Sequence, residues 1–187
     1  MTTPMTAPWN ISLPYTLTVG GEEQPIRTDY RVALDCFLAL NDAELDGYNK
    51  VLEVIDCLYI NEIPTEHLEE ALTQAFWYLR GGEDEPKRKS PQLVSWAQDF
   101  NYIASPISKI IGTDIRGLDN LHWWSFLSAY MSIGDCMFAQ IVRIRDMKLR
   151  GKKLDKADIE FYRRNRDAID IHKEITEAEK EILDKWI

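Results

Sequence analysis

Cysteine is scarce in this sequence, and its pattern excludes a disulfide framework. The three cysteines are Cys36, Cys57 and Cys136, and none of them sits in a C-x-x-C pair. An odd count without paired spacing is not typical of a disulfide-stabilised scaffold. Each cysteine lies within an apolar run. We therefore expect three reduced, buried thiols that pack as small hydrophobic side chains in a cytosolic protein.

Targeting signals and long apolar runs are also missing. The segment from Met1 to Ser12 has no basic start followed by an apolar block, which a secretory signal would have. No apolar run approaches the ~20 residues of a membrane span. The net charge is −9, and an acidic chain is repelled by nucleic acid and by anionic membrane surfaces. The sequence therefore predicts a cytoplasmic protein whose partners are neither nucleic acid nor membrane.

Motifs that carry catalysis are absent as well. There is no G-x-S-x-G elbow, and no cysteine is paired locally with a histidine. Gly81-Gly82 is followed by three acidic residues, which would repel phosphate. We therefore expect a non-enzymatic protein without a cofactor, which works by binding another protein.

The three histidines show no spacing typical of a metal site. They are His67, His122 and His172. His122 is the one candidate for a functional role, because it stands beside Trp123 and Trp124. The alternative is a core histidine whose hydrogen bonds are satisfied. The tryptophans can stack nucleic-acid bases, but their place in an apolar helix favours the core.

What the sequence does contain supports a folded helical protein. Hydrophobic residues make up 45% and aromatic residues 11% of the 187 residues, enough for a core within one domain. Short β-prone runs on either side of Gly20-Gly21 are typical of a β-hairpin. Helical spacing of apolar residues dominates from Asp29 onward. The expected fold is mostly α, with a hairpin segment over 1–28, a helical core domain over 29–153 and a long C-terminal helix over 154–187.

Three helices carry specific expectations. Ser90-Pro91 should start a helix, and Ser105-Pro106 should kink or end it. A helix beginning at Asp119-Asn120 is aromatic and apolar on nearly every side, so it should lie buried at the centre. A final helix from Leu154 to Trp186 carries a narrow apolar stripe, which suits pairing with another helix. The stripe consists of Ile171, Ile175, Ala178 and Ile182.

Charge is distributed unevenly along the chain. Residues 143–166 hold ten basic and four acidic side chains, a local balance of +6. The rest of the chain has a balance of −15. A basic stripe on an acidic body can bind an acidic partner or attract another copy of the same chain. The same pattern is also that of an ordinary solvated helix face.

One acidic loop resembles a calcium-binding loop. Asp42, Glu44 and Asp46 alternate before Gly47, and Glu53 stands at the twelfth place. Such oxygens converge on calcium when glycine makes the sharp turn. Glu44 is longer than the usual third ligand, and the loop has no second copy to pair with. The alternative is an inter-helix loop in which Asp46 caps the next helix.

Several residue runs resemble the bacteriophage "gene product fifteen" family. The first is Leu13-Pro14, Val19-Gly20-Gly21, Pro25-Ile26 and Thr28-Asp29-Tyr30-Arg31, which is similar to the opening of that family. The second is Leu121-His122-Trp123-Trp124 with Phe126, similar to the family's most distinctive patch. Ile141 and Ile144-Arg145 resemble the helix after it. The resemblance extends from about Leu13 to Tyr162, and Ser105-Pro106 departs from the pattern.

The resemblance implies a role in phage tail assembly. Genes of this family usually lie between those for the major tail protein and the tape-measure protein. That position implies a chaperone that coats the helical tape-measure protein in the bacterial cytoplasm, or else a tail component that remains in the virion. Self-association is also expected. The predicted contact residues are Arg143, Arg145, Tyr162, Arg163, Ile171, Ile175 and Ile182.

Overall fold

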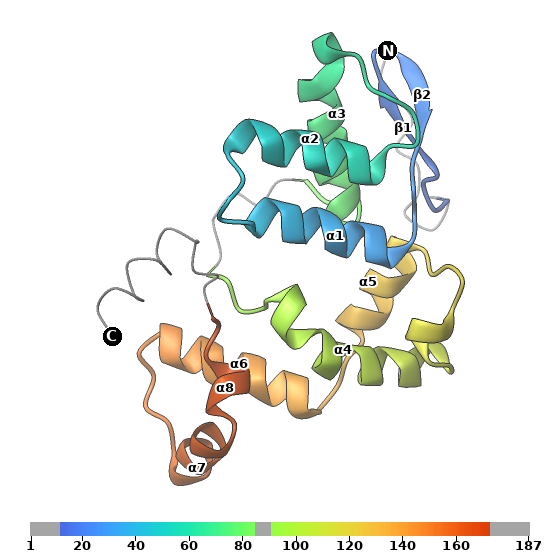
Figure 1. Cartoon of the computed structure of the whole chain (residues 1–187). Helices are drawn as coiled ribbons and strands as arrows, with labels where there is room; N and C mark the ends of the chain where they lie inside the picture. The colour runs from blue at the N-terminus through green and yellow to red at the C-terminus, as the bar shows by residue number, and fades with distance from the viewer. Residues whose placement is uncertain (1–11, 85–90, 173–187) are drawn as a thin grey trace, which may run out of the picture.

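The predicted fold class is confirmed by a computed structural model, which describes residues 12–84 and 91–172. Figure 1 shows a hairpin and helices α1–α3 in one half of the molecule and helices α4–α8 in the other. Within the described residues, the only sheet is the two-stranded hairpin near the N-terminus. None of the helices in this part of the chain combines the length and apolar character needed to cross a bilayer.

The hairpin joins β1 (Thr16–Val19) to β2 (Glu22–Pro25) in antiparallel register. Gly20 and Gly21 form the turn with φ of +61° and +80°. Glycine adopts these left-handed angles without steric cost, so the Gly-Gly pair sets a two-residue turn. Leu17 and Val19 point inward and are buried. The hairpin is thus held by packing on the helices, as a marginally stable two-stranded unit requires.

Three helices follow the hairpin: α1 (Tyr30–Asn41), α2 (Gly47–Leu58) and α3 (Leu68–Leu79), the last preceded by a short turn, η2 (Thr65–His67). Asp29 accepts a hydrogen bond from the backbone of Arg31 and caps α1. Asp46 accepts one from the backbone of Asn49 and caps α2. Each carboxylate satisfies a backbone N–H that has no partner within its helix.

Helix α4 (Trp96–Ile111) starts later than the sequence indicates and continues through Pro106. The chain from Pro91 to Ser95 is not helical. The Ser95 hydroxyl oxygen caps the helix by accepting the backbone N–H of Gln98. Pro106 does not end the helix. A proline inside a helix costs about 3 kcal/mol, whereas burying one isoleucine stabilises by about 1.5–3 kcal/mol. Ile103 and Ile107 are both fully buried on either side of Pro106, and their packing outweighs the lost hydrogen bond.

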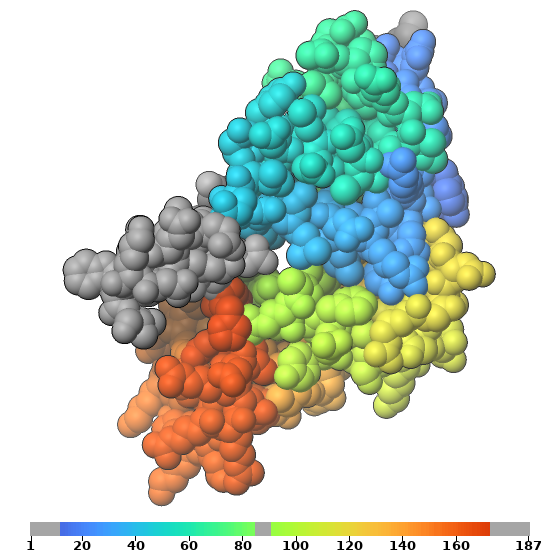
Figure 2. Space-filling model, in the orientation of Figure 1, coloured from blue at the N-terminus to red at the C-terminus, as the bar shows by residue number. Residues whose placement is uncertain are grey.

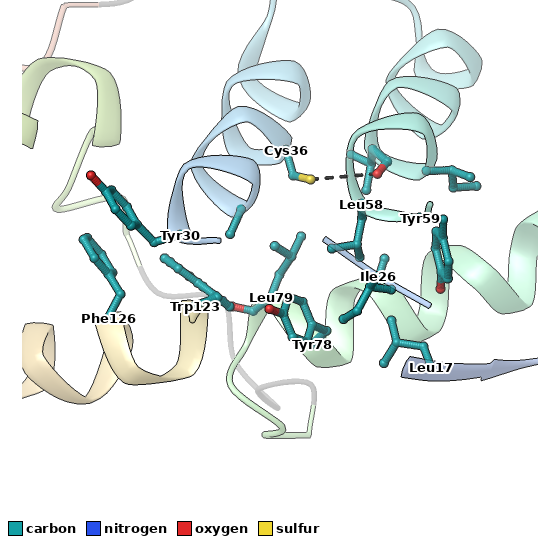
Figure 3. Packing of buried hydrophobic residues seen from close by; sticks show 14 of the residues in the cluster. Leu17, Ile26, Tyr30, Cys36, Leu58, Tyr59, Tyr78, Leu79, Trp123 and Phe126 are labelled. Atoms are coloured by element: carbon teal, nitrogen blue, oxygen red, sulfur yellow. Dashed lines mark hydrogen bonds between the residues drawn. The ribbon is translucent and has the colours of Figure 1, made fainter. Parts of the chain in front are cut away.

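The aromatic helix is α5 (Trp123–Met131), reached through a short turn, η3 (Ile115–Gly117). Trp123 and Phe126 are completely buried, which confirms its central position. The side of α5 at Ser128 and its end at Met131, which is 74% exposed, reach solvent. Figure 3 shows Trp123 close to Leu79 and Tyr78 of α3, with Tyr30 facing Phe126 across the same core.

The prediction of one continuous helix from Leu154 is wrong in the described residues. Helix α6 (Met137–Leu149) is followed by α7 (Lys156–Arg164) and a short α8 (Arg166–Ile169). Asn165 breaks the run, and its side chain donates to the Phe161 carbonyl at 2.9 Å. The break turns Ile169 back into a small core with Ile141 and Ile144 of α6. Ile175, Ala178 and Ile182 lie outside the described residues.

Candidate functional site

A groove opens between α1 and α4, which run antiparallel. Phe37 near the end of α1 lies 5.9 Å from Trp96 at the start of α4, measured between ring centroids, and Tyr30 lies 6.3 Å from Phe100. Two adjoining hollows, of about 510 and 310 Å³, share Leu38, Trp96 and Ala97. Figure 2 shows the surface notched between the blue of α1 and the yellow-green of α4.

The part of the groove that the two hollows share is apolar and open to solvent. Leu38 is 44% exposed although it belongs to a helix that packs on the core. Leu34, Trp96 and Phe100 are half-buried beside it, with Ala97 exposed on the facing helix. A run of accessible apolar side chains between two helices is the surface that receives the apolar face of an amphipathic helix.

Charged groups stand at both ends of the groove. Arg31, Asp35 and Arg116 line one end, and Asp42 with His172 lines the other. Burial, together with the nearby charge of Asp29, raises the pKa of the Asp35 carboxyl. Charges of both signs around an apolar floor suit a protein segment whose flanks are themselves charged.

The two family-like sequence runs meet in the interior. The Asp29 carboxylate accepts the backbone N–H of Leu121 at 2.9 Å, and the Thr28 carbonyl accepts that of Trp123 at 2.7 Å. The Tyr30 ring stacks on Phe126 with centroids 4.8 Å apart. These runs therefore join the start of α1 to the start of α5, a joint that serves the fold.

Arg31 and His122 complete this joint. One guanidinium nitrogen of Arg31 donates to the carbonyls of Arg116 and Leu118 at 3.1 and 2.9 Å. Nε2 of His122 lies 2.9 Å from the Pro14 carbonyl, which can only accept, so Nε2 carries the proton. Nδ1 then accepts the backbone N–H of Trp124 at 3.0 Å and caps α5. His122 is thus a satisfied structural residue.

Both tryptophans of the second run are also engaged in the interior. Nε1 of Trp123 donates to the Leu79 carbonyl at 3.0 Å, and Nε1 of Trp124 donates to the Tyr78 carbonyl at 2.9 Å. These two hydrogen bonds connect the start of α5 to the C-terminal end of α3. Trp123 is fully buried in the core and Trp124 packs against it while partly buried, which supports their interpretation as core residues.

A second buried joint holds α4, α6 and α8 together. Arg145 makes a two-pronged ion pair with Asp99, with N–O distances of 2.6 and 2.9 Å. It also donates to the carbonyls of Leu93, Ala168 and Ile169. Asp99 accepts the backbone N–H of Ser95 as well. The sequence predicted Arg145 as a partner contact. The structure buries it in the interior, so it is not part of the candidate surface.

The family now follows from the sequence match. The family model described as "Bacteriophage Gp15 protein" matches residues 10–171. The chain belongs to the bacteriophage Gp15 family. The matched range includes both interior joints and every residue that lines the groove except His172. Comparison with curated proteins and with solved structures found no match.

The calcium-like loop serves this phage protein as a helix connection. Asp42 accepts the backbone N–H of Glu44, and Asp46 accepts that of Asn49, both at 2.8 Å. Glu53 lies within α2. In the part of the chain that the structure describes, no group of three or more His, Cys, Asp or Glu side chains is placed to hold a metal ion. The geometry matches the capping alternative for Asp46.

The other predicted contact residues divide between engaged and available side chains. Arg143 pairs with Asp158, and this hydrogen bond lowers the pKa of the Asp158 carboxyl. The Tyr162 hydroxyl donates to Asp170 at 2.8 Å. Arg163 is exposed, and Ile171 lines one end of the groove. Ile175 and Ile182 fall outside the described residues. Sequence reasoning missed the groove itself.

Proposed function

We propose that this protein is a tail assembly chaperone, which binds a helical segment of the phage tape-measure protein in the groove between α1 and α4. The observation that carries the proposal is the accessible apolar floor around Leu38 and Trp96. Membership of a bacteriophage protein family supports a phage role. The action is one of binding and release, with no chemical step.

Physical chemistry supports the pairing of this groove with such a guest. A tape-measure protein is a long amphipathic helical chain, whose apolar ridge would aggregate if left in water. Laying that ridge on Leu34, Leu38 and Phe100 removes apolar surface on both sides from water. Many copies along one guest act together, so each contact can remain weak enough to be displaced by tail-tube subunits.

The test is co-expression of the chain with the tape-measure protein encoded by the same phage, followed by solubility measurement and pull-down. We expect the wild-type chain to keep the guest soluble. Leu38→Glu should abolish co-purification, because it places a charge on the apolar floor. Met131→Glu, a change at a more exposed site outside the groove, is the matched control and should bind normally. Circular dichroism verifies that both variants are folded.

Two results would count against this function. If the guest is no more soluble with the wild-type chain than without it, the chaperone role is wrong. If purified virions contain the chain in stoichiometric amount by mass spectrometry, it is a structural tail component instead. Equal binding of the guest by the Leu38→Glu and Met131→Glu variants would show that the groove is not the binding site.

A further inference from the structure

The two ends of the molecule carry opposite charge. Residues 12–84 contain 15 acidic and 4 basic side chains, a balance of −11, whereas residues 143–166 have a balance of +6. Figure 1 places the turn before α3 at one end of the molecule and α7 at the other. The acidic and basic side chains that are separated along the sequence are thus also separated in space, toward opposite ends of the molecule.

Most charges of the basic stretch are neutralised locally, but one group is not. Six of its ten basic side chains form ion pairs; they are Arg143, Arg145, Lys148, Arg150, Arg164 and Arg166. The other four are exposed and form no ion pair within the described ranges. We call these four the basic tip, which consists of Lys152, Lys153, Lys156 and Arg163. Two exposed apolar side chains, Leu149 and Ile159, belong to the same α6–α7 region.

The opposite end presents a complementary surface. Glu62, Glu66 and Glu69 lie between the end of α2 and the first turn of α3, and all three are exposed. They form no ion pair with any residue that the structure describes. Ile60, just before them, is also exposed. We call these four residues the acidic face. Each surface thus combines unpaired charges of one sign with exposed apolar side chains.

We propose that copies of this chain associate head to tail, with the basic tip of one copy bound to the acidic face of the next. The carboxylates and ammonium groups would steer and orient the contact, while Ile60 meets Leu149 or Ile159 at its centre. The two surfaces differ and lie at opposite ends, so the contact is heterologous and leaves a free tip and a free face. Such a contact repeats from copy to copy, and it gives an open row unless the rotation between copies closes it into a ring.

A second copy fits the basic tip better than nucleic acid does. Nucleic acid would meet four unpaired basic groups on a chain whose net charge is −9, so the whole molecule would oppose its approach. Another copy presents carboxylates that have no partner of their own, together with an exposed isoleucine. This proposal does not depend on the identity of any guest in the groove.

Sedimentation velocity of the full chain is the direct test. We expect oligomers at low salt that dissociate at about 0.5 M NaCl, where the Debye length falls to a few ångströms. One variant reverses the charge of the basic tip through Lys152→Glu, Lys153→Glu and Lys156→Glu. The other variant reverses the charge of the acidic face through Glu62→Lys, Glu66→Lys and Glu69→Lys. Each variant alone should associate at least 10-fold more weakly, and an equimolar mixture of the two should regain association.

The two variants also separate a specific contact from general repulsion. Face reversal brings the net charge from −9 toward zero, so general repulsion predicts stronger association, whereas the head-to-tail contact predicts weaker association. Lys109→Glu, a single charge reversal at an exposed site on α4, should leave association unchanged. The proposal is overturned by a wild-type chain that is monomeric at low salt, by stronger association of the face-reversed variant, or by a mixture that stays monomeric.

Discussion

Replacing Arg145 with methionine should destabilise the protein far more than the same change at Arg143. Both arginines lie on α6 and both pair with an aspartate, but the Arg145 side chain is 4% exposed and that of Arg143 is 52% exposed. Removing one partner of a buried ion pair costs about 3–5 kcal/mol, because the other charge is left without compensation. An ion pair whose partner is exposed to solvent contributes about 0.2–1 kcal/mol, and the Arg143 guanidinium is such a partner although the Asp158 carboxylate is 9% exposed.

The surroundings of Arg145 place its cost at the upper part of that range. Its loss would leave the Asp99 carboxylate buried, and the Ser95 backbone N–H would be its one remaining donor among the residues that the structure describes. Three backbone carbonyls, of Leu93, Ala168 and Ile169, would lose donors at the same time. For a chain of this size a loss of about 4–5 kcal/mol lowers Tm by roughly 8–20 °C.

Urea unfolding followed by tryptophan fluorescence measures the difference directly. Arg143→Met is the matched control and should shift the unfolding free energy by less than about 1 kcal/mol. Arg145→Lys keeps the charge but cannot reproduce the five-donor fork, so its stability should fall between wild type and Arg145→Met. Equal stabilities of the Arg145→Met and Arg143→Met variants would refute the reasoning that burial, and not ion pairing itself, sets the cost.

Three further results are expected. His122→Ala should lose about 1 kcal/mol in thermal unfolding because α5 loses its cap, and His122→Asn, which retains a capping side chain, should recover most of it. Cys36 should react with a thiol reagent only in denaturant, because burial raises the pKa of its thiol to about 12; rapid reaction of all three cysteines in the native protein would contradict this. Calcium should give no heat in calorimetric titration, whereas Asp46→Ala should lower Tm through loss of the α2 cap.

Local signals were sufficient for much of the fold. The Gly20-Gly21 turn and the caps at Asp29 and Asp46 each depend on neighbours within three residues, so the sequence alone displays them. The break at Asn165 was not visible, because helical spacing continues through it. The break accompanies the burial of Ile169 against Ile141 and Ile144 of α6, a contact between parts of the chain that are distant in the sequence.

The candidate site was harder to predict than the fold. Leu38 and Trp96 have the same spacing as true core residues, and only the separation of α1 from α4 leaves them accessible. The error for Arg145 was the reverse, because a residue predicted at the surface is buried. Arginine is rarely buried, so its position in a basic stretch indicated a surface role. Its partner Asp99 is 46 residues away, and no local pattern connects the two.

The joint between Asp29 and Leu121 has a consequence for synthesis of the protein. The hydrogen bond spans 92 residues, which a ribosome adds in roughly 5–20 s. During that interval the inner sides of α1 and α3 have emerged without α5 to cover them. A nascent chain that stalls before Leu121 therefore leaves these apolar faces open to proteases and chaperones, so slower translation between α3 and α5 should lower the yield of folded protein.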